Sequence, residues 1–110
     1  MRDKLIASIT FCKRLGKLVL GFDLVKNAMQ LGEARIVLLA SDLSEKTKKE
    51  ANYLCQMFQT PLYQTELTLD EFWYLVNKRA GILAVTDEGF ARKIEGLLGD
   101  DMRLAGPFED

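Results

Sequence analysis

Histidine is absent from the 110-residue sequence, and cysteine and proline occur only twice each. Because histidine is the side chain most often used for proton transfer near neutral pH, its absence excludes an ordinary hydrolytic triad. The two cysteines, Cys12 and Cys55, are far apart in the sequence and leave too few ligands for a zinc site. Both fall on the apolar faces of expected helices, where a thiol behaves as a small buried hydrophobic group.

Long apolar runs are missing as well. No stretch approaches the roughly 18 to 20 apolar residues that a membrane span requires, and charges occupy the start of the chain, where a signal peptide needs an apolar core. Hydrophobic residues make up 48% of the chain and charged residues 28%, which is typical of a folded domain. The sequence therefore predicts one cytoplasmic domain that does not associate with a membrane.

The charge is balanced overall but unevenly distributed. Residues 1–50 contain ten Lys and Arg against six Asp and Glu, whereas residues 51–110 contain five against ten. A basic face on one side of a domain can bind nucleic acid, although a pI of about 5.5 is well below that of a strongly basic protein. A solvated surface explains the same distribution, so charge alone does not decide the function.

The periodicity of apolar residues predicts helices that alternate with short strands. Such alternation is typical of an α/β fold, here a three-layer α/β/α sandwich with a central mixed sheet of about four strands. We expect residues 1–99 to form this single domain and residues 100–110 to be a loosely ordered acidic tail. Helices are expected at 2–15 and 22–31, from 42 to 58, from 68 to 76 and from 86 to 98, and strands at 17–20, 35–40, 62–63 and 82–85.

Polar residues at the expected helix starts predict helix caps. Asp42 with Glu45, and Thr68 with Glu71, have the spacing of a capping box, and a Thr-Asp pair precedes the last helix. Asp42 and Asp87 also follow strands, where α/β enzymes often place ligand groups, so a magnesium-dependent phosphoryl-transfer site is an alternative. Such a site needs several converging carboxylates, but the first expected strand ends in glycine without an acidic pair and Leu43 follows Asp42. Helix capping is therefore the favoured interpretation.

The sequence has no common phosphate-binding loop and only a weak signal for base stacking. Neither common glycine-rich phosphate loop, GxxxxGK[ST] or GxGxxG, is present. Phe72, Trp73 and Tyr74 form an aromatic cluster in which one face of the helix at most can be buried. A platform for stacking bases is conceivable there, but packing of the helix on the core is the simpler interpretation.

Three motifs carry a resemblance to a known family. They are GK-x-x-x-G at residues 16–21, A-x-D-x-S at residues 40–44, and TDEGFA followed by a basic residue at residues 86–92. Together they resemble the bacterial YlxQ/YbxF-type members of the ribosomal protein L7Ae/L30e family, over about residues 5–98. The resemblance implies an α/β/α sandwich without catalysis, cofactor or metal. Relatives bind kink-turn RNA, which implies structured RNA, including ribosomal RNA, and a protein of the translation machinery as partners.

The resemblance places RNA at the helix start after the first strand and at the loop before the last strand. In relatives that helix start often reads G-x-N-E-x-x-K, and its Asn, Glu and Lys contact sheared G·A pairs. The corresponding residues here are Asp23, Leu24 and Asn27, with a lysine one place early at Lys26. Asp23 brings a carboxylate near phosphates, and Leu24 cannot accept a hydrogen bond. We therefore expect weaker reading of bases than in relatives.

The part of an RNA site that binds phosphates is retained. The helix N-terminus offers free N–H groups, and Lys13, Arg14, Lys17 and Lys26 flank it. The second loop, NKRAG, supplies two cations and a small Ala-Gly pair that would let RNA approach closely, although an ordinary solvated loop is the alternative. The predicted RNA-binding residues are Lys13, Arg14, Lys17, Gly21, Asp23, Lys26, Asn27, Lys78, Arg79 and Gly81.

The sequence therefore predicts a small, non-enzymatic, ribosome-associated protein that recognises structured, kink-turn-like RNA. The alternative is a family member that has lost kink-turn recognition and acts as a protein-interaction domain, through its acidic second half or its aromatic helix. The opposed charges of the acidic tail and the basic turn also suggest an autoinhibitory contact between them.

Overall fold

The computed structural model describes residues 2–99 and 102–105. Helices and strands alternate along this part of the chain, as the apolar periodicity predicts. Among the described residues, no helix is both long enough and apolar enough to cross a membrane. The elements are α1 (Arg2–Arg14), β1 (Leu18–Leu20), α2 (Phe22–Gln30), β2 (Ile36–Leu39), α3 (Glu45–Phe58), β3 (Leu62–Gln64), α4 (Leu69–Val76), β4 (Ile82–Val85), α5 (Glu88–Leu98) and β5 (Arg103–Ala105).

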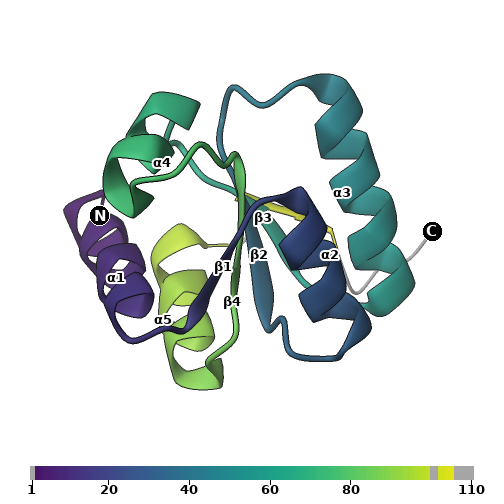
Figure 1. Cartoon of the computed structure of the whole chain (residues 1–110), viewed down its shortest axis with the longest axis horizontal. Coiled ribbons are helices and arrows are strands. Elements are labelled where there is room, and N and C mark those ends of the chain that lie inside the picture. Colours follow the sequence, from purple (N-terminus) through teal and green to yellow (C-terminus); the bar gives the residue numbers. More distant parts are fainter. Residues whose placement is uncertain (1, 100–101, 106–110) are drawn as a thin grey trace.

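The strands form one sheet between two layers of helices (Figure 1). The strand order is β1-β4-β2-β3-β5, in which β2 and β3 are parallel and the other neighbours are antiparallel. Helices α1, α4 and α5 cover one face, and α2 and α3 cover the other. The predicted three-layer α/β/α sandwich with a mixed sheet is confirmed.

The central strands β2 and β4 are buried on both faces, which explains why they are apolar without alternation. Ile36 and Leu38 pack into the core beneath α1, α4 and α5. Val37 and Leu39, which point to the opposite face, pack beneath α2 and α3. All four side chains are fully buried, so this one strand contributes to the hydrophobic cores on both faces of the sheet.

The sheet has a fifth strand that the sequence did not predict. β5 lies within the segment expected to be a loosely ordered tail, and it pairs antiparallel with β3. Its Arg103 guanidinium lies 5.9 Å from the centre of the Tyr63 ring. β1 and β3 are equally short but begin with adjacent large apolar or aromatic residues, whereas β5 has one large apolar residue, Leu104, which is why it was missed. Residues 100–101 and 106–110, and with them the expected autoinhibitory contact, lie outside the described residues.

Two of the expected caps are confirmed. Thr68 and Glu71 form a capping box, in which the Glu71 N–H donates to Thr68 Oγ1 (3.2 Å) and the Thr68 N–H donates to Glu71 Oε1 (2.9 Å). The bond from the Thr68 N–H, together with an ion pair to Arg2, lowers the pKa of Glu71. Asp87 caps α5 by accepting from the Phe90 N–H at 2.9 Å.

The expected cap of α3 is wrong. The helix begins at Glu45, and its cap is Ser44, whose Oγ accepts from the Thr47 N–H at 3.2 Å. Ser44 has the extended backbone of an N-cap residue, so the helix starts after the DLSE motif has begun. Asp42 instead accepts from the Leu69 N–H at 2.8 Å and ties this turn to the start of α4.

Both cysteines are buried, as their helical positions predict. Cys12 and Cys55 have no exposed surface, and both are free thiols. Burial raises the pKa of the Cys12 thiol to about 11 and the pKa of the Cys55 thiol to about 12. Cys55 packs against Met29, with 3.8 Å between the two sulfur atoms. These thiols are protonated at neutral pH and serve packing.

Candidate nucleic-acid interface

The first helix turn of α2 is open to a ligand. Gly21 precedes it with φ of 94°, a backbone conformation that favours glycine, and it has no side chain to cap the helix. The first intrahelical bond runs from the Val25 N–H to the Gly21 carbonyl at 2.9 Å. The N–H groups between these residues therefore have no helical partner and carry the positive end of the helix dipole. This geometry suits an anion such as a phosphate.

The loop between α4 and β4 lies beside this helix start. The Gly21 N–H donates to the Ile82 carbonyl at 3.0 Å, next to the end of that loop. The loop begins at Asn77, whose left-handed backbone (φ of 56°) ends α4. Lys78 and Arg79 follow it, and both are exposed. The structure therefore brings together the two segments that the sequence analysis selected, although they are more than fifty residues apart in the chain.

Arg79 packs on an aromatic side chain, Trp73, that the sequence did not predict to be part of the site. Its guanidinium lies 4.7 Å from the centre of the Trp73 ring, which is 44% exposed. Consecutive residues of a helix point about 100° apart, so three adjacent aromatics cannot share one buried face. Phe72 is fully buried, whereas Tyr74 is 88% exposed. That spacing was the available signal that Trp73 and Tyr74 lie at the surface.

Gly81 packs against the ends of two leucine side chains inside the protein. A Cβ atom at this position would overlap the side chains of Leu43 and Leu69. Ala80, its neighbour, is buried. Packing is therefore one reason for the small size of this pair, and close approach by RNA stays a prediction.

The other side chains of the α2 start point in several directions. Asp23 and Asn27 are exposed, and their four-residue spacing puts them on one face of the helix. Leu24 is 52% exposed. Lys26 lines a shallow hollow toward α3, together with Tyr53. We call the group Gly21, Asp23, Lys26, Asn27, Lys78, Arg79 and Gly81 the loop-end surface.

Three predicted RNA-binding residues lie at the other end of β1. The Lys17 carbonyl accepts from the Thr86 N–H at 3.0 Å, and β1 separates it from Gly21. Four residues of extended chain span about 13 Å. Lys13 and Arg14 precede Lys17, at the end of α1. The structure therefore does not bring Lys13, Arg14 and Lys17 together with the loop-end surface.

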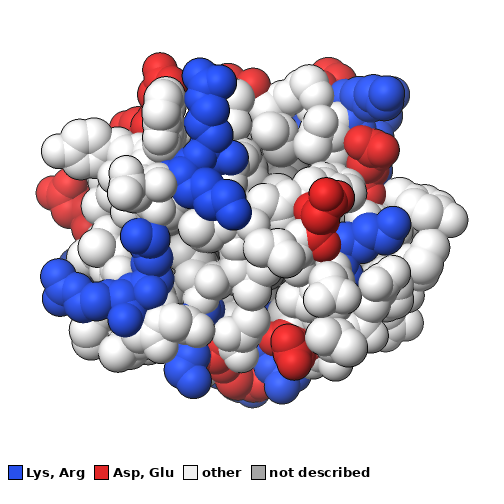
Figure 2. Space-filling model, viewed as in Figure 1, with Lys and Arg blue, Asp and Glu red and all other residues white. Residues whose placement is uncertain are grey.

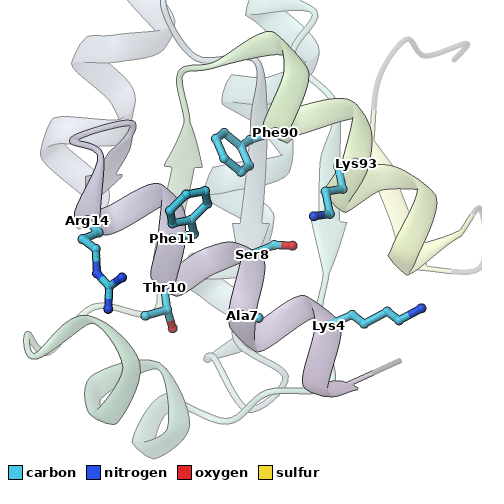
Figure 3. Close-up of a pocket in the computed structure, with 8 residues that line it drawn as sticks. All are labelled: Lys4, Ala7, Ser8, Thr10, Phe11, Arg14, Phe90 and Lys93. Carbon is cyan, nitrogen blue, oxygen red and sulfur yellow. The ribbon is translucent and has the colours of Figure 1, made fainter.

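This separation is visible at the molecular surface. On the face shown in Figure 2, Lys and Arg side chains form separate groups, one over α1 and another over the α4–β4 loop, with uncharged surface between them. Arg14 also contributes to a groove between α1 and α5 that the sequence did not predict (Figure 3). We call it the α1–α5 groove, and Lys4, Thr10, Phe11, Arg14, Phe90 and Lys93 are among its lining residues.

Asp42 and Asp87 cannot form one metal site. β2 and β4 are antiparallel, with Ile36 opposite Val85 and Leu39 opposite Ile82. The residues that follow these strands therefore lie at opposite ends of the sheet. Each carboxylate instead accepts a backbone hydrogen bond at the start of a helix. The geometry therefore rejects the alternative of a phosphoryl-transfer site built from this pair.

The family model of the Ribosomal protein L7Ae/L30e/S12e/Gadd45 family matches residues 3–95. The chain belongs to this family. The chain is 33% identical over 85 residues to a Bacillus subtilis protein named RNA-binding protein YlxQ, a match that covers 77% of this chain and 85% of that protein. It is 29% identical over 97 residues to the Enterococcus faecium protein of the same name, covering 88% and 93%.

A solved structure supports the same assignment to the L7Ae/L30e family fold. A protein of unknown function from Bacillus halodurans superposes with a TM-score of 0.80 and 27% identity. The match covers 86% of this chain and 96% of that chain. The resemblance inferred from the GK-x-x-x-G, A-x-D-x-S and TDEGFA motifs is thereby confirmed.

Proposed function

We propose that this L7Ae/L30e-family member is a non-enzymatic RNA-binding protein and that the loop-end surface is its RNA site. The observation that carries the proposal is the hydrogen bond from the Gly21 N–H to the Ile82 carbonyl. It holds the uncapped start of α2 beside the cationic α4–β4 loop, so that helix N–H groups and side-chain cations face one ligand. The YlxQ relatives, which are named RNA-binding proteins, support it.

Two kinds of phosphate contact follow from this surface. The free N–H groups after Gly21 donate to one phosphate, and Lys78 and Arg79 bind the neighbouring backbone. Trp73 stacks against Arg79 and reduces the number of conformations that this long side chain can adopt. Less rotamer entropy is then lost when Arg79 binds RNA.

Base recognition rests on Asp23 and Asn27. Asn27 can donate to and accept from a base edge, whereas the Asp23 carboxylate only accepts and repels phosphates. We propose a structured, kink-turn-like RNA as the ligand, read with modest specificity. The family description, which names ribosomal proteins, supports ribosomal RNA as its source, a cytoplasmic location and partners in the translation machinery.

The test compares two RNAs at one stated salt concentration. One is a kink-turn, and the other is the same RNA with its sheared G·A pairs replaced by Watson–Crick pairs. We expect tighter binding to the intact kink-turn, and this preference should fall when Asn27 is replaced by Ala. Equal affinities for both RNAs would reject kink-turn recognition. Loss of affinity for both RNAs in Lys78→Glu/Arg79→Glu would still support general RNA binding at this surface.

One observation favours the second candidate function, a protein-interaction domain that has lost kink-turn recognition. Leu24 is 52% exposed at the position where relatives often have a Glu that contacts G·A pairs. An exposed leucine beside a helix start suits an apolar protein contact better than a base edge. The same pair of RNAs distinguishes the two functions, because the second predicts weak binding that salt abolishes and that does not differ between them.

A further inference from the structure

The α1–α5 groove shares no residue with the loop-end surface. It is open to solvent, has a volume of about 690 Å³ and lies between α1 and α5, on the sheet face opposite α2 and α3 (Figure 3). No contact in the proposed RNA site uses it. A ligand could therefore occupy the groove while RNA occupies the loop-end surface.

The floor of the groove is aromatic. The rings of Phe11 and Phe90 meet edge to face, with 5.5 Å between their centres and 79° between their planes. Phe11 remains 47% exposed, although a phenylalanine gains most when it is buried. Thr10, the hydroxyl residue next to Phe11, donates its Oγ1 to the Ile6 carbonyl at 2.8 Å. This hydroxyl is engaged within α1, and the other hydroxyl residue of the lining, Ser8, is only 4% exposed. The floor therefore offers apolar contact more than hydrogen bonds to a ligand.

The rim of the groove is positively charged. Lys4 and Arg14 lie near opposite ends of α1, about 15 Å apart along a helix, and Lys93 extends from α5 toward α1 (Figure 3). All three are exposed, and none of them forms an ion pair with another described residue. Long cationic side chains around an apolar floor favour a ligand that pairs carboxylates with apolar groups.

Three nearby carboxylates already have partners, whereas Asp3, which precedes Lys4 on α1, is exposed and forms no ion pair with another described residue. Glu88 accepts from Arg92 on the outside of α5, at 2.9 Å. Asp87 caps α5, and Glu71 pairs with Arg2. Lys4, Arg14 and Lys93 outnumber this one acid, so the rim keeps a net positive charge that is available to a partner.

We propose that the α1–α5 groove docks an acidic amphipathic segment of a partner protein. An apolar side chain of that segment packs on Phe11 and Phe90, and its flanking carboxylates pair with Lys4, Arg14 and Lys93. A protein segment fits better than RNA, because the apolar floor presents few groups that could recognise the polar edges of bases. The groove then gives this family member a protein contact that is independent of its RNA site.

The test uses a short synthetic helical peptide as the probe, labelled with a fluorophore. It carries one Phe at its centre, Leu residues one turn to either side and Glu at the exposed positions. We expect saturable binding to the full chain by fluorescence anisotropy. Cross-peaks of residues on α1 and α5, including the Phe11 amide, should shift in NMR spectra. A peptide with Gln in place of Glu, and one with Ala in place of Phe, should each bind at least about tenfold more weakly.

Charge reversal locates the binding site on the protein. Lys4→Glu/Lys93→Glu should weaken peptide binding by at least about tenfold, while Lys46→Glu/Lys49→Glu, on α3, serves as the matched control and should change it little. All four lysines are exposed or lie on helix surfaces, so folding is retained and is checked by circular dichroism. Phe11→Ala gives a second, uncharged test of the floor, and it should also lower the affinity about tenfold.

Three results would overturn the proposal. One is the absence of saturable peptide binding, and another is an equal loss of affinity in the α3 control. The third is an oligouridylate that shifts the same α1 and α5 resonances and displaces the peptide, because the groove would then be a second nucleic-acid site. None of these results bears on the loop-end surface, whose RNA binding is measured separately in the same variants.

Discussion

The loop-end surface and the α1–α5 groove are both basic, yet they are built differently. At the loop-end surface, cations stand beside unpaired backbone N–H groups at the start of α2. In the groove, cations surround two phenylalanine rings, and the start of α5, where Phe90 lies, is already capped by Asp87. Backbone N–H groups favour phosphates, whereas an aromatic floor favours apolar side chains.

A count of Lys and Arg therefore does not locate a nucleic-acid site. Lys13, Arg14 and Lys17 are close in sequence to Gly21, but one strand separates them from it. Lys78 and Arg79 are far away in sequence, but they lie beside Gly21 because β1 pairs with β4. What surrounds each cation distinguishes the two regions, and the following changes test that distinction.

The largest effect is expected from reversing the two cations of the α4–β4 loop. Lys78→Glu/Arg79→Glu removes two phosphate contacts and adds two repulsive charges, so RNA affinity should fall on the order of a hundredfold at moderate salt. The matched double reversal in the groove, Lys4→Glu/Lys93→Glu, should change RNA affinity by less than about threefold. Filter binding at several salt concentrations measures both, and similar losses in the two variants would contradict the division between the regions.

The turn at Gly21 is expected to contribute to stability as well as to binding. Gly21→Ala places a side chain at φ of 94°, which costs about 1–3 kcal/mol of unfolding free energy. Gly96→Ala is the matched control, because Gly96 lies within α5 with open space where its Cβ would be, and it should raise stability by about 0.5–1 kcal/mol. Urea denaturation measures both. Equal stability of the two variants would show that the Gly21 conformation is not strained by a side chain.

Removing the charge of Asp23 is expected to make the loop-end surface more positive and so to favour RNA. Asp23→Asn removes a carboxylate from the first turn of α2 and restores an amide, so RNA should bind about three- to tenfold more tightly. The same change should lower stability by about 0.3–1 kcal/mol, because an acidic residue favours a helix N-terminus. Unchanged or weaker RNA binding, measured with the kink-turn, would show that Asp23 does not face the RNA.

The fold followed from the sequence because its strongest signals are local. The apolar strands β2 and β4, and the capping residues Thr68 and Asp87, are each set by a few neighbouring residues. β5 was not predicted because Arg103, Leu104 and Ala105 carry little apolar signal of their own and form a strand by pairing with β3. Asp42 was assigned to the wrong helix because its partner, the Leu69 N–H, comes from a distant part of the chain.

The candidate site was less predictable, because it depends on strand pairing. The sequence identified Gly21, Lys78 and Arg79, but only the register of β1 against β4 makes them neighbours. The same register places Lys17 beside Thr86, at the far end. The α1–α5 groove was missed because Phe11 and Phe90 meet only when α1 packs on α5, and neither residue stands out in its own helix.

The smallest expected effect separates the role of Trp73 from that of a general aromatic surface. Trp73→Ala removes the ring beneath the Arg79 guanidinium, so RNA affinity should fall about two- to fivefold, in line with a cation–π contact of about 0.5–1 kcal/mol. Tyr74→Ala is the matched control. This neighbouring ring is 88% exposed, and among the described residues the cation–π partner of Arg79 is Trp73. Anisotropy titrations with one RNA should show the loss only for Trp73→Ala.

A double variant tests whether the Trp73 ring acts through Arg79. If Arg79→Ala already binds RNA weakly, adding Trp73→Ala should lower the affinity little further, because the ring acts through that arginine. Additive losses would instead mean that Trp73 contacts the RNA directly, and the loop-end surface would then share the aromatic character of the α1–α5 groove.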